Sequence, residues 1–590
     1  MMWGPQIVGE GRARFRLWAP DRDAVTLELD GSDPQPMERG EGGWFTTEAE
    51  AHPGTRYRFH LPPSRLREGP GVGPSNSTDG PQEDTPPDLT VPDPASRAQA
   101  DGVHGWSLLT DPAAYRWRTP EWQGRPWEEA VIQEVHAGVL GGFAGVAERL
   151  PELAALGVTA IELMPIADFS GSRNWGYDGV LPYAVATPYG TPDELKALVD
   201  RAHELGLMVL LDVVYNHFGP DGNYLGAYAS GFFDEHAHTP WGGAVAVSKE
   251  PVRRFLIDNA LMWLSEYHLD GLRFDAVHAI ADNAFLDAMA QEIRATLPDR
   301  HIHLVLENEG NDPDRLAPGL YTAQWNDDFH NVLHVILTGE HEGYYEAFSK
   351  SPTQKLARCL SEGFIFQGEV CGEHERGAPS GHLPPTSFVS FLQNHDQVGN
   401  RALGERLVLL AGPDKLRAAT ALLLLMPQIP LLFMGEEAGS RSPFLFFTDF
   451  HDELADAVRN GRRKEFAKFS AFADPEVRET IPDPNAPETF ARSGPEPGPD
   501  ADEWRSLYAD LLAIRRGHIV PRLAGARSMS VEVLGEGALN ACWQLGDGAT
   551  LALVFNLGDT PVTFPPPEGT LLFELLEPGA PGSFLAWLAR

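Results

Sequence analysis

Residues 271–278 read GLRFDAVH, a short apolar strand that carries two charged side chains and runs into a loop. Alternate side chains of a strand share a face, so Arg273 and Asp275 point one way and Leu272 and Phe274 point the other. The neighbouring arginine favours the charged form of the Asp275 carboxyl. An ionised carboxylate at the carboxyl end of a strand is a candidate nucleophile, but an ion pair that only braces the strand has the same pattern. This stretch alone leaves both interpretations open.

Similar apolar strands recur along the chain, with helical segments between them. We expect eight strands, at residues 130–136, 160–164, 207–212, 271–276, 302–307, 323–325, 387–391 and 430–434. Between the second and third strands, residues 191–194 read TPDE, a capping box with proline at the first helical position, which predicts a helix as far as Leu205. Eight strand–helix units predict an α/β fold, a closed (β/α)8 TIM barrel. An open doubly wound sheet is the alternative, but no glycine-rich phosphate loop follows the first strand.

Two β-rich regions flank the predicted barrel. Residues 1–105 alternate apolar and polar side chains between closely spaced Gly and Pro, which predicts an N-terminal β-sandwich of a carbohydrate-binding type. Residues 106–524 carry the barrel, with a small inserted subdomain at about 217–246. Residues 525–590 return to β alternation and predict a C-terminal β-sandwich. A stretch rich in Pro, Gly, Ser and Asp at 70–94 predicts a loop or linker.

The charge balance excludes several classes of partner. The chain has 590 residues, with 84 acidic and 46 basic side chains, so its formal net charge is −38. Nucleic acid and anionic membrane surfaces both require basic patches, so we expect neither partner. A neutral, hydroxyl-rich substrate is compatible with this charge.

The cysteines and the amino terminus bear on the compartment. Three scattered cysteines form neither a disulfide framework nor a zinc site, and they fit a reducing cytosol. No charged segment followed by an apolar run begins the chain, and no apolar run is long enough to cross a bilayer. We therefore expect a cytoplasmic protein with no membrane partner and no cofactor.

Polar side chains gather at the carboxyl ends of four predicted strands. The third strand ends in Asp212 and leads to His217, the fourth ends in RFDAVH, the fifth ends at Glu307, and the seventh runs into QNHDQVGN at 393–400. The carboxyl ends of all strands meet at one mouth of a barrel. Burying several charges together is costly, so a cluster of this size indicates function rather than bracing.

These four segments resemble the four signature regions of the α-amylase superfamily of glycosidases and glucanotransferases, in the expected order. The flanking regions resemble the terminal domains of its multidomain members. The resemblance implies that Asp275 is the nucleophile, Glu307 the general acid/base and Asp396 the stabiliser of the transition state. It also implies a set of sugar-binding residues: His217, Arg273 and His395 around the glucosyl unit, Tyr177 stacked on it, and Asp212, His278, Gln397 and Asn400 nearby.

The implied chemistry sets further expectations. Cleavage with retention needs two carboxyl groups about 5–5.5 Å apart. Glu307 must start protonated, so we expect burial and the neighbouring Asp275 and Asp396 to raise its pKa. Asp212 and Asn216 occupy positions that help to bind calcium in many amylases. No acidic loop suited to calcium follows them, so we expect no metal, and a supporting hydrogen-bonding role for Asp212.

Two further segments narrow the resemblance. WNDDFH at 325–330 and GRRKEF at 461–466, together with the chain length, resemble maltooligosyltrehalose trehalohydrolases. These enzymes cleave the α-1,4 bond next to a terminal trehalose, and their substrate is an α-glucan oligosaccharide ending in trehalose. The resemblance implies Trp325, Asp327, Asp328 and His330 as candidate contacts to the disaccharide. The alternative is that Asp327 caps a helix and Trp325 belongs to the core.

Other functions stay open at this point. A glycogen branching or debranching enzyme shares the leading sandwich, and a branching enzyme would transfer the glucan chain instead of giving it to water. A non-catalytic glucan-binding protein could use the same fold, although the intact Asp275, Glu307 and Asp396 argue against it. The trehalohydrolase resemblance implies pairing with an enzyme that forms maltooligosyltrehalose. We expect a monomer or homodimer.

Overall fold

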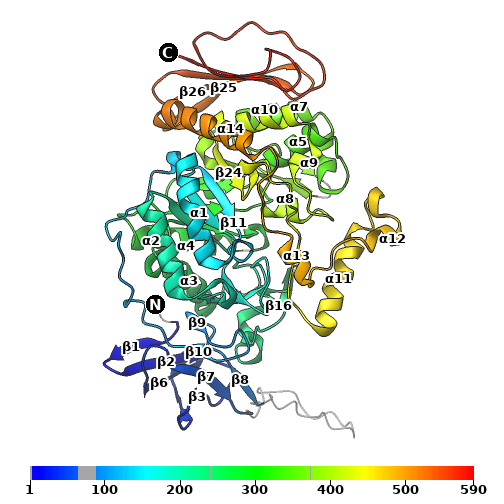
Figure 1. Cartoon of the computed structure of the whole chain (residues 1–590). Coiled ribbons are helices and arrows are strands. Elements are labelled where there is room, and N and C mark those ends of the chain that lie inside the picture. The colour runs from blue at the N-terminus through cyan, green and yellow to red at the C-terminus, as the bar shows by residue number, and fades with distance from the viewer. Residues whose placement is uncertain (1–2, 64–87, 240–241, 281, 372–373) are drawn as a thin grey trace.

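The computed structural model describes residues 3–63, 88–239, 242–280, 282–371 and 374–590. A central barrel lies between an N-terminal pair of sheets and a C-terminal sheet, and the chain runs from one end of this arrangement to the other (Figure 1).

Eight parallel strands form a closed barrel, which confirms the predicted fold class and excludes the open sheet. Their order is β11-β12-β15-β18-β19-β20-β23-β24, and β24 pairs with β11 to close the ring. Each strand is short and fully buried, as expected for apolar strands covered by helices. The bounds are β11 Ile132–Val135, β12 Ala160–Leu163, β15 Met208–Val213, β18 Gly271–Phe274, β19 His303–Leu306, β20 Ala323–Trp325, β23 Phe388–Ser390 and β24 Ile429–Phe433.

Helices cover the barrel between successive strands (Figure 1). The main ones are α1 Gly142–Leu156, α2 Pro192–Glu204, α3 Glu250–Glu266, α4 Asn283–Thr296, α5 Asp327–Thr338, α7 Pro352–Glu362 and α10 Pro413–Leu425. The predicted capping box starts α2: the Thr191 hydroxyl accepts the Glu194 N–H at 3.2 Å, and the Glu194 carboxylate accepts the Thr191 N–H at 2.7 Å. This local signal was sufficient to place the start of the helix.

The N-terminal region is a sandwich of two antiparallel sheets. One contains β1 Gln6–Gly9, β2 Arg12–Trp18, β6 Trp44–Glu50 and β5 Glu38–Arg39, in that order; the other contains β4 Gln35–Pro36, β3 Thr26–Leu29, β7 Arg56–Leu61, β10 Ser107–Leu108 and β9 Ala98–Gln99, with β8 Leu89–Val91 also on β7. Their alternating apolar residues fill one core. Strand β8 lies inside the stretch expected to be a loop, because it finds a partner in β7; residues 64–87 of that stretch lie outside the described residues.

The C-terminal region is a single sheet over its described residues, which corrects the expected sandwich. Five antiparallel strands follow the order β25-β26-β27-β29-β28, with bounds β25 Arg527–Gly535, β26 Ala538–Gln544, β27 Thr550–Asn556, β29 Phe584–Ala589 and β28 Thr570–Leu575. One face packs on α7 and α10 in a shared apolar core. Helices of the barrel thus supply the second layer that alternation alone could not identify.

Long excursions leave the barrel at its carboxyl end. After β15 comes the hairpin of β16 Phe233–Thr239 and β17 Gly242–Val245, and after β12 comes the pair β13 Ala167–Phe169 and β14 Gly179–Val185. Strand β23 is followed by the short helices α8 His395–Gly399 and α9 Leu407–Leu410. Strand β24 is followed by α11 Asp452–Phe466, α12 Pro475–Arg478, α13 Pro487–Ala491 and α14 Ala501–Ile514. Helices α11 and α12 project from the side of the molecule (Figure 1).

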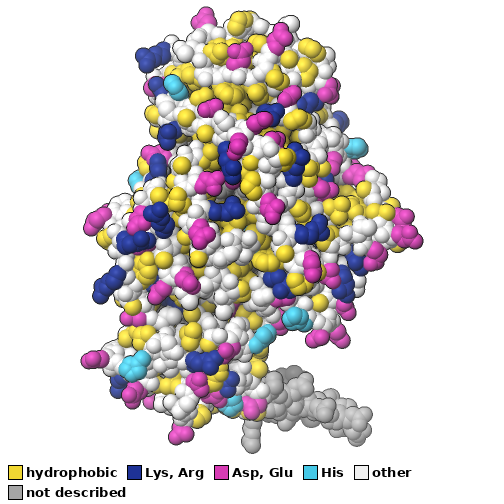
Figure 2. All heavy atoms as spheres, in the orientation of Figure 1, with side chains coloured by type: hydrophobic (Ala, Val, Ile, Leu, Met, Phe, Trp, Pro, Cys, Tyr) yellow, Lys and Arg dark blue, Asp and Glu magenta, His cyan; other side chains and the backbone are white. Residues whose placement is uncertain are grey.

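The surface shows no single dominant charge patch on the face in view. Acidic and basic side chains are interspersed over all three regions (Figure 2). Among the described residues, no helix is both long enough and apolar enough to span a bilayer.

Candidate active site

Arg273 is the centre of the site at the barrel mouth. Its Nη1 donates to Asp212 Oδ2 at 2.6 Å and to Asp275 Oδ1 at 3.0 Å, and its Nη2 lies 2.8 Å from Glu307 Oε2. The guanidinium lies over the ring of Trp325, 4.0 Å from its centroid. Strands β15, β18 and β19 are neighbours in the barrel, so three carboxylates from three strands converge on one cation. A bidentate guanidinium suits this arrangement better than a point charge would.

The exposed fractions of these side chains distinguish the buried supporting groups from the carboxyls that a ligand can reach. The side chains of Arg273 and Asp212 are each 1% exposed, whereas those of Asp275 and Glu307 are 12% and 18% exposed. A ligand at the mouth can therefore reach the Asp275 and Glu307 carboxyls, while Arg273 and Asp212 hold them from beneath.

The pKa shifts of the two reachable carboxyls, Asp275 and Glu307, differ from the expectation. Burial raises the pKa of Asp275 well above its ordinary value, and the Glu307 charge adds to the effect against the opposing Arg273. Burial alone would also raise the pKa of Glu307, but the Arg273 guanidinium and the Ala276 N–H lower it below its ordinary value. The pKa values of the two carboxyls are therefore shifted in opposite directions, and the expected raised pKa of Glu307 is wrong. The reason is the direct Arg273–Glu307 ion pair.

A strained backbone fixes the positions of these carboxyls. Ala276 has a left-handed φ of 40°, which is uncommon for a residue with a Cβ. Its N–H donates to Glu307 Oε2 at 2.8 Å, and the Val277 N–H donates to the Glu307 carbonyl at 3.0 Å. Asn216 Nδ2 donates to Asp275 Oδ2 at 3.3 Å. The strain is offset by hydrogen bonds that tie the β18 loop to the end of β19.

His395 is held as a cation by a residue that the sequence did not single out. Its Nδ1 lies 2.5 Å from Glu134 Oε1, and its backbone N–H donates to Glu134 Oε2 at 2.8 Å. Burial alone would lower the pKa of His395, but Glu134 raises it to about 9. The only trace in the sequence is a charged residue in the middle of an apolar strand, in VIQEVH at 131–136.

Asp396 lies in the first turn of α8 and is half-exposed. The Asn394 side chain caps this helix by accepting the N–H groups of Asp396 at 2.9 Å and of Gln397 at 3.2 Å. At the other end of the turn, Asn400 Nδ2 donates to Asp396 Oδ1 at 2.8 Å. His395 Nε2 lies 3.9 Å from the same oxygen. The Asp396 backbone is therefore held by Asn394 and its carboxylate by Asn400.

Tyr177 and His217 form one wall of the mouth. The Tyr177 hydroxyl donates to Asp212 Oδ2 at 2.5 Å, and its ring stacks on His395 with the centroids 5.0 Å apart. His217 Nε2 lies 2.9 Å from the Tyr177 carbonyl, and burial lowers the pKa of His217 to about 4. Tyr177 thus contacts a charged His395 through its ring and a neutral His217 through its backbone carbonyl.

Asp327 and Gln397 lie beside this wall. Gln397 Nε2 donates to Asp327 Oδ1 at 3.2 Å. Burial, followed by the charges of Glu307 and Asp396, raises the pKa of Asp327 to about 8. This carboxyl therefore belongs to the same electrostatic cluster. It lies in the first turn of α5, but the N-cap of that helix is Asn326, so the capping alternative for Asp327 is wrong. His278 is partly exposed on the rim, where its Nδ1 accepts a backbone N–H at 3.3 Å.

Three predicted sugar contacts are closed off from solvent, and those predictions are corrected. Trp325 lies in the barrel interior beneath Arg273, so the core alternative holds for it. Asp328 is fully buried and ion-paired to Arg376 at 2.9 Å. His330 is buried with its Nδ1 2.6 Å from the Leu392 carbonyl, and burial lowers its pKa to about 3. Asp328 and His330 point away from the mouth because of the helical periodicity of α5. The sequence of the segment alone did not show this orientation.

A second buried carboxyl inside the barrel was also missed from the sequence. Glu162 on β12 is 1% exposed, and among the described residues neither of its oxygens has a hydrogen-bond partner. Burial raises its pKa well above the ordinary value, with further contributions from Asp212 and Glu134. The raised pKa favours the uncharged form of Glu162.

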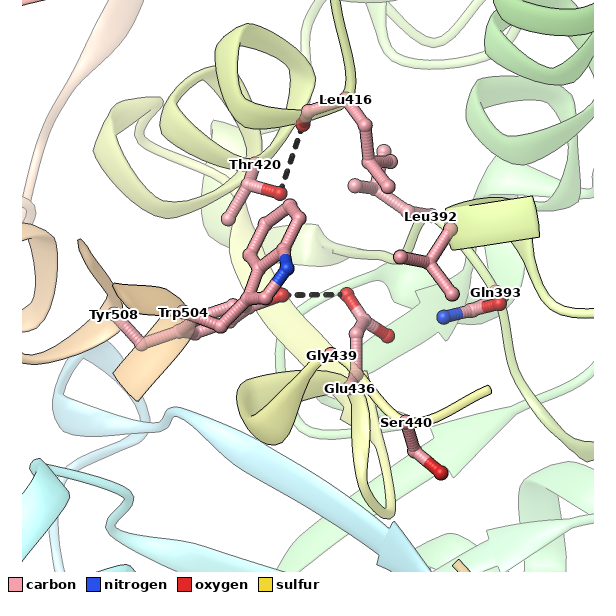
Figure 3. A pocket seen from close by; sticks show the side chains of 10 residues that line it. Leu392, Gln393, Leu416, Thr420, Glu436, Gly439, Ser440, Trp504 and Tyr508 are labelled. Carbon is pink, nitrogen blue, oxygen red and sulfur yellow. Dashed lines mark hydrogen bonds between the residues drawn. The ribbon is translucent and has the colours of Figure 1, made fainter. Parts of the chain in front are cut away.

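A small pocket lined by residues other than those of the site is shown in Figure 3. In Figure 3, Glu436 points toward Tyr508, whose hydroxyl donates to it at 2.9 Å, and Gln393 and Trp504 lie on opposite sides. Burial raises the pKa of Glu436 to about 7. The cavity of about 20 Å³ holds roughly one water molecule, which excludes a glucan ring.

Comparison with known proteins places this site in a family. Residues 95–239 match the family model of the alpha amylase catalytic domain, and residues 526–587 match a domain of unknown function, DUF3459. The malto-oligosyltrehalose trehalohydrolase of Deinococcus radiodurans is 40% identical over 524 residues, covering 86% of this chain and 82% of that protein. The enzyme of the same name from Saccharolobus solfataricus is 38% identical over 547 residues, covering 90% and 89%.

A solved structure agrees over the whole chain. The crystal structure of a Salmonella typhimurium protein assigned as an alpha amylase superposes with a TM-score of 0.91 at 44% identity, and all of both chains is covered. Identity, coverage and the barrel-mouth arrangement agree, and the chain belongs to the malto-oligosyltrehalose trehalohydrolase family of the α-amylase superfamily.

Proposed function

We propose that this protein is a retaining glycosidase that hydrolyses the α-1,4 bond next to the terminal trehalose of maltooligosyltrehalose, releasing trehalose and a malto-oligosaccharide. The names of the relatives and the coverage of their chains support the substrate class. The observation that carries the reaction type is the pair of reachable carboxyls, Asp275 and Glu307, held by one buried Arg273. Such a pair is what double displacement requires.

In this proposal each carboxyl has one task. Asp275 attacks the anomeric carbon, and the C–O bond to the leaving sugar breaks as Glu307 gives that oxygen its proton. Glu307 then takes a proton from water, which displaces Asp275 from the glycosyl carbon and restores both groups. Asp396, fixed by Asn400, would bind the hydroxyls of the distorted ring more tightly in the transition state than in the ground state.

Glu307 must carry a proton before the first step. Pairing with Arg273 lowers the pKa of Glu307, whereas burial raises the pKa of Asp275. We propose that the entering sugar displaces Glu307 from Arg273. Arg273 then stabilises Asp275 as the anion, and the proton passes to Glu307. The two carboxyls share one proton and titrate as a pair, so the pH profile of kcat/KM reports the pair.

The remaining site residues are assigned from their positions at the barrel mouth. Tyr177 and the charged His395 would line the sugar at the cleavage point, with His217 and His278 at its edges. Asp327, Gln397 and Asn400 border the side on which the leaving disaccharide would lie, and Asp327 replaces Asp328 as the acidic group available to trehalose. The partner enzyme that supplies the substrate, the oligomeric state and the cytoplasmic location stay predictions.

A product analysis separates the candidate functions. The protein is incubated with maltooligosyltrehalose and, separately, with amylose, and the products are identified by chromatography. Free trehalose from the first substrate supports the proposal. Branched glucan from the second supports transfer, and no product from either, with retained glucan binding, supports a non-catalytic binder. A trehalose yield no greater than that of an Asp275→Asn, Glu307→Gln double variant would refute the proposed function.

A further inference from the structure

The GRRKEF segment at 461–466 has no role in the site described above. It forms the end of α11, the helix that projects beside the barrel (Figure 1). Most side chains of α11 are exposed or half-buried, but Arg462 is only 8% exposed. A charged side chain that is buried on an otherwise polar helix must be satisfied by specific partners, because its desolvation is costly.

Arg462 pairs with Glu465 on its own helix at 3.4 Å, and its other hydrogen-bond partners are residues that follow Asp396. Its Nη2 donates to the Gly399 carbonyl at 2.7 Å and to the Arg401 carbonyl at 3.2 Å, and its Nη1 lies 3.5 Å from Asn400 Oδ1. The guanidinium plane lies over the ring of Phe466, 4.7 Å from its centroid. One side chain from a distant helix thus holds three consecutive residues at the end of α8.

The contact reaches Asp396 through a single residue. Asn400 is bound through its oxygen to Arg462 and through its nitrogen to Asp396 Oδ1, the latter at 2.8 Å. The orientation of the Asn400 amide is therefore fixed by a donor on one side and a carboxylate on the other. The opposite end of α8 is fixed separately by the Asn394 cap. The position of the Asp396 carboxyl depends on both anchors.

We propose that Arg462 is a positioning residue for Asp396: it fixes the turn at 399–401 and orients the Asn400 amide that binds the Asp396 carboxylate. This inference rests on the proposed function in so far as Asp396 acts on the sugar. Arginine is needed because its planar fork presents several donors in fixed directions, whereas lysine has one rotating ammonium. A displacement of about 1 Å in a catalytic group is enough to cost about 100-fold in rate.

Variants of Arg462 and of its neighbour test the proposal. Arg462→Met keeps an apolar side chain against Phe466 and removes every donor, and Arg462→Lys keeps the charge but not the fork. Arg463→Met is the matched control, because Arg463 is adjacent on the same helix and, among the described residues, its ion-pair partner is the exposed Glu479, at 2.7 Å. We expect Arg462→Met to lower kcat about 10- to 100-fold with KM within about threefold, Arg462→Lys to recover only part of that loss, and Arg463→Met to stay within about twofold of wild type.

Ligand affinity distinguishes positioning from general damage. Because Asp396 is proposed to act on the distorted ring, Arg462→Met is expected to weaken an amine-linked pseudo-oligosaccharide with a half-chair ring about 10-fold, while the affinity for the product maltotriose changes less than about twofold. A folded Arg462→Met variant with kcat/KM within about twofold of wild type, or with equal losses for both ligands, overturns the proposal. Should Arg462→Met fail to melt cooperatively, Arg462→Lys is measured by the same two criteria.

Turnover is measured on both maltooligosyltrehalose and plain maltohexaose, so that the role of Arg462 and the proposed function are tested separately. A wild-type protein that cleaves only maltohexaose refutes trehalose specificity, yet the comparison of Arg462 variants is still decided on maltohexaose. The affinities for the pseudo-oligosaccharide and for maltotriose are measured without turnover. They therefore test the role of Arg462 whichever α-glucan the protein cleaves.

Discussion

Replacing Glu134 by glutamine should make the stability of this protein less sensitive to alkaline pH. Glu134 binds His395 through both carboxylate oxygens, at 2.5 Å to Nδ1 and 2.8 Å to the backbone nitrogen. It raises the pKa of His395 from 6.5 to about 9 although burial opposes the rise. A difference of that size corresponds to about 3 kcal/mol of stability, as an upper limit. Solvent screening does not reduce this figure much, because the His395 side chain is 3% exposed.

The sign of the pH effect follows from the raised pKa. The folded state binds the His395 proton more tightly than the unfolded state, so the stabilisation is fully present below pH 6.5 and is lost as the pH rises through about 9. In Glu134→Gln the amide still accepts a hydrogen bond, but the carboxylate that contributes most to stabilising the imidazolium is gone and only the weaker effect of Asp396 remains. The difference in unfolding free energy between wild type and variant should therefore be about 3 kcal/mol near pH 6 and much smaller at pH 10.

Urea unfolding from pH 6 to pH 10 measures this difference. The readout is the shift in midpoint between the two proteins, because a chain with three sheet regions need not unfold in one step. Glu266→Gln is the matched control: Glu266 pairs at 2.7 Å with Arg97, which stays charged throughout this range, so its midpoint shift should be flat with pH. An equally flat shift for Glu134→Gln would refute the reasoning, since it would mean that His395 is neutral in the folded state.

Three further outcomes are expected. Asp275→Asn should lose nearly all turnover, by at least about 10³-fold, while maltotriose binding measured by calorimetry persists; near-normal turnover would contradict the nucleophile assignment. Asp328→Ala leaves Arg376 without its buried partner and should destabilise the fold by roughly 3 kcal/mol, lowering activity on trehalose-ended and plain chains alike; a loss confined to the trehalose-ended substrate would restore a direct contact. Gly399→Ala places a Cβ 2.1 Å from the ring of Trp175, so kcat should fall about 10-fold or more, and unchanged kcat would show that the turn can shift freely.

Local patterns were enough for most of the fold. The eight barrel strands were found because each is a short apolar run between helical segments, and the start of α2 was found because the capping box involves residues only three apart. The C-terminal sheet was found as strands, but its second layer was not. Alternation reports that a strand has one buried face, and it does not report whether a sheet or a helix covers that face.

The site, like the fold, was predicted only in part from the sequence. Asp275, Glu307 and Asp396 were located because the carboxyl ends of parallel strands share one mouth. Glu134 was missed, since its partner His395 lies 261 residues away and the pair is visible only when the barrel closes. Asp328 was assigned to the substrate because the segment at 325–330 resembles trehalohydrolases, yet the α5 helix turns the Asp327 and Asp328 carboxyls in different directions.

The sequence by itself determined the closed barrel, its flanking β regions and the residues that meet at its mouth, because hydrophobic period and strand direction are properties of short segments. Only the tertiary structure decided which charges share Arg273, why the pKa values of Asp275 and Glu307 shift in opposite directions, and how Arg462 on α11 reaches the turn after Asp396. Those depend on burial and on distances between segments far apart in the chain, and both are set only when the strands and loops pack together.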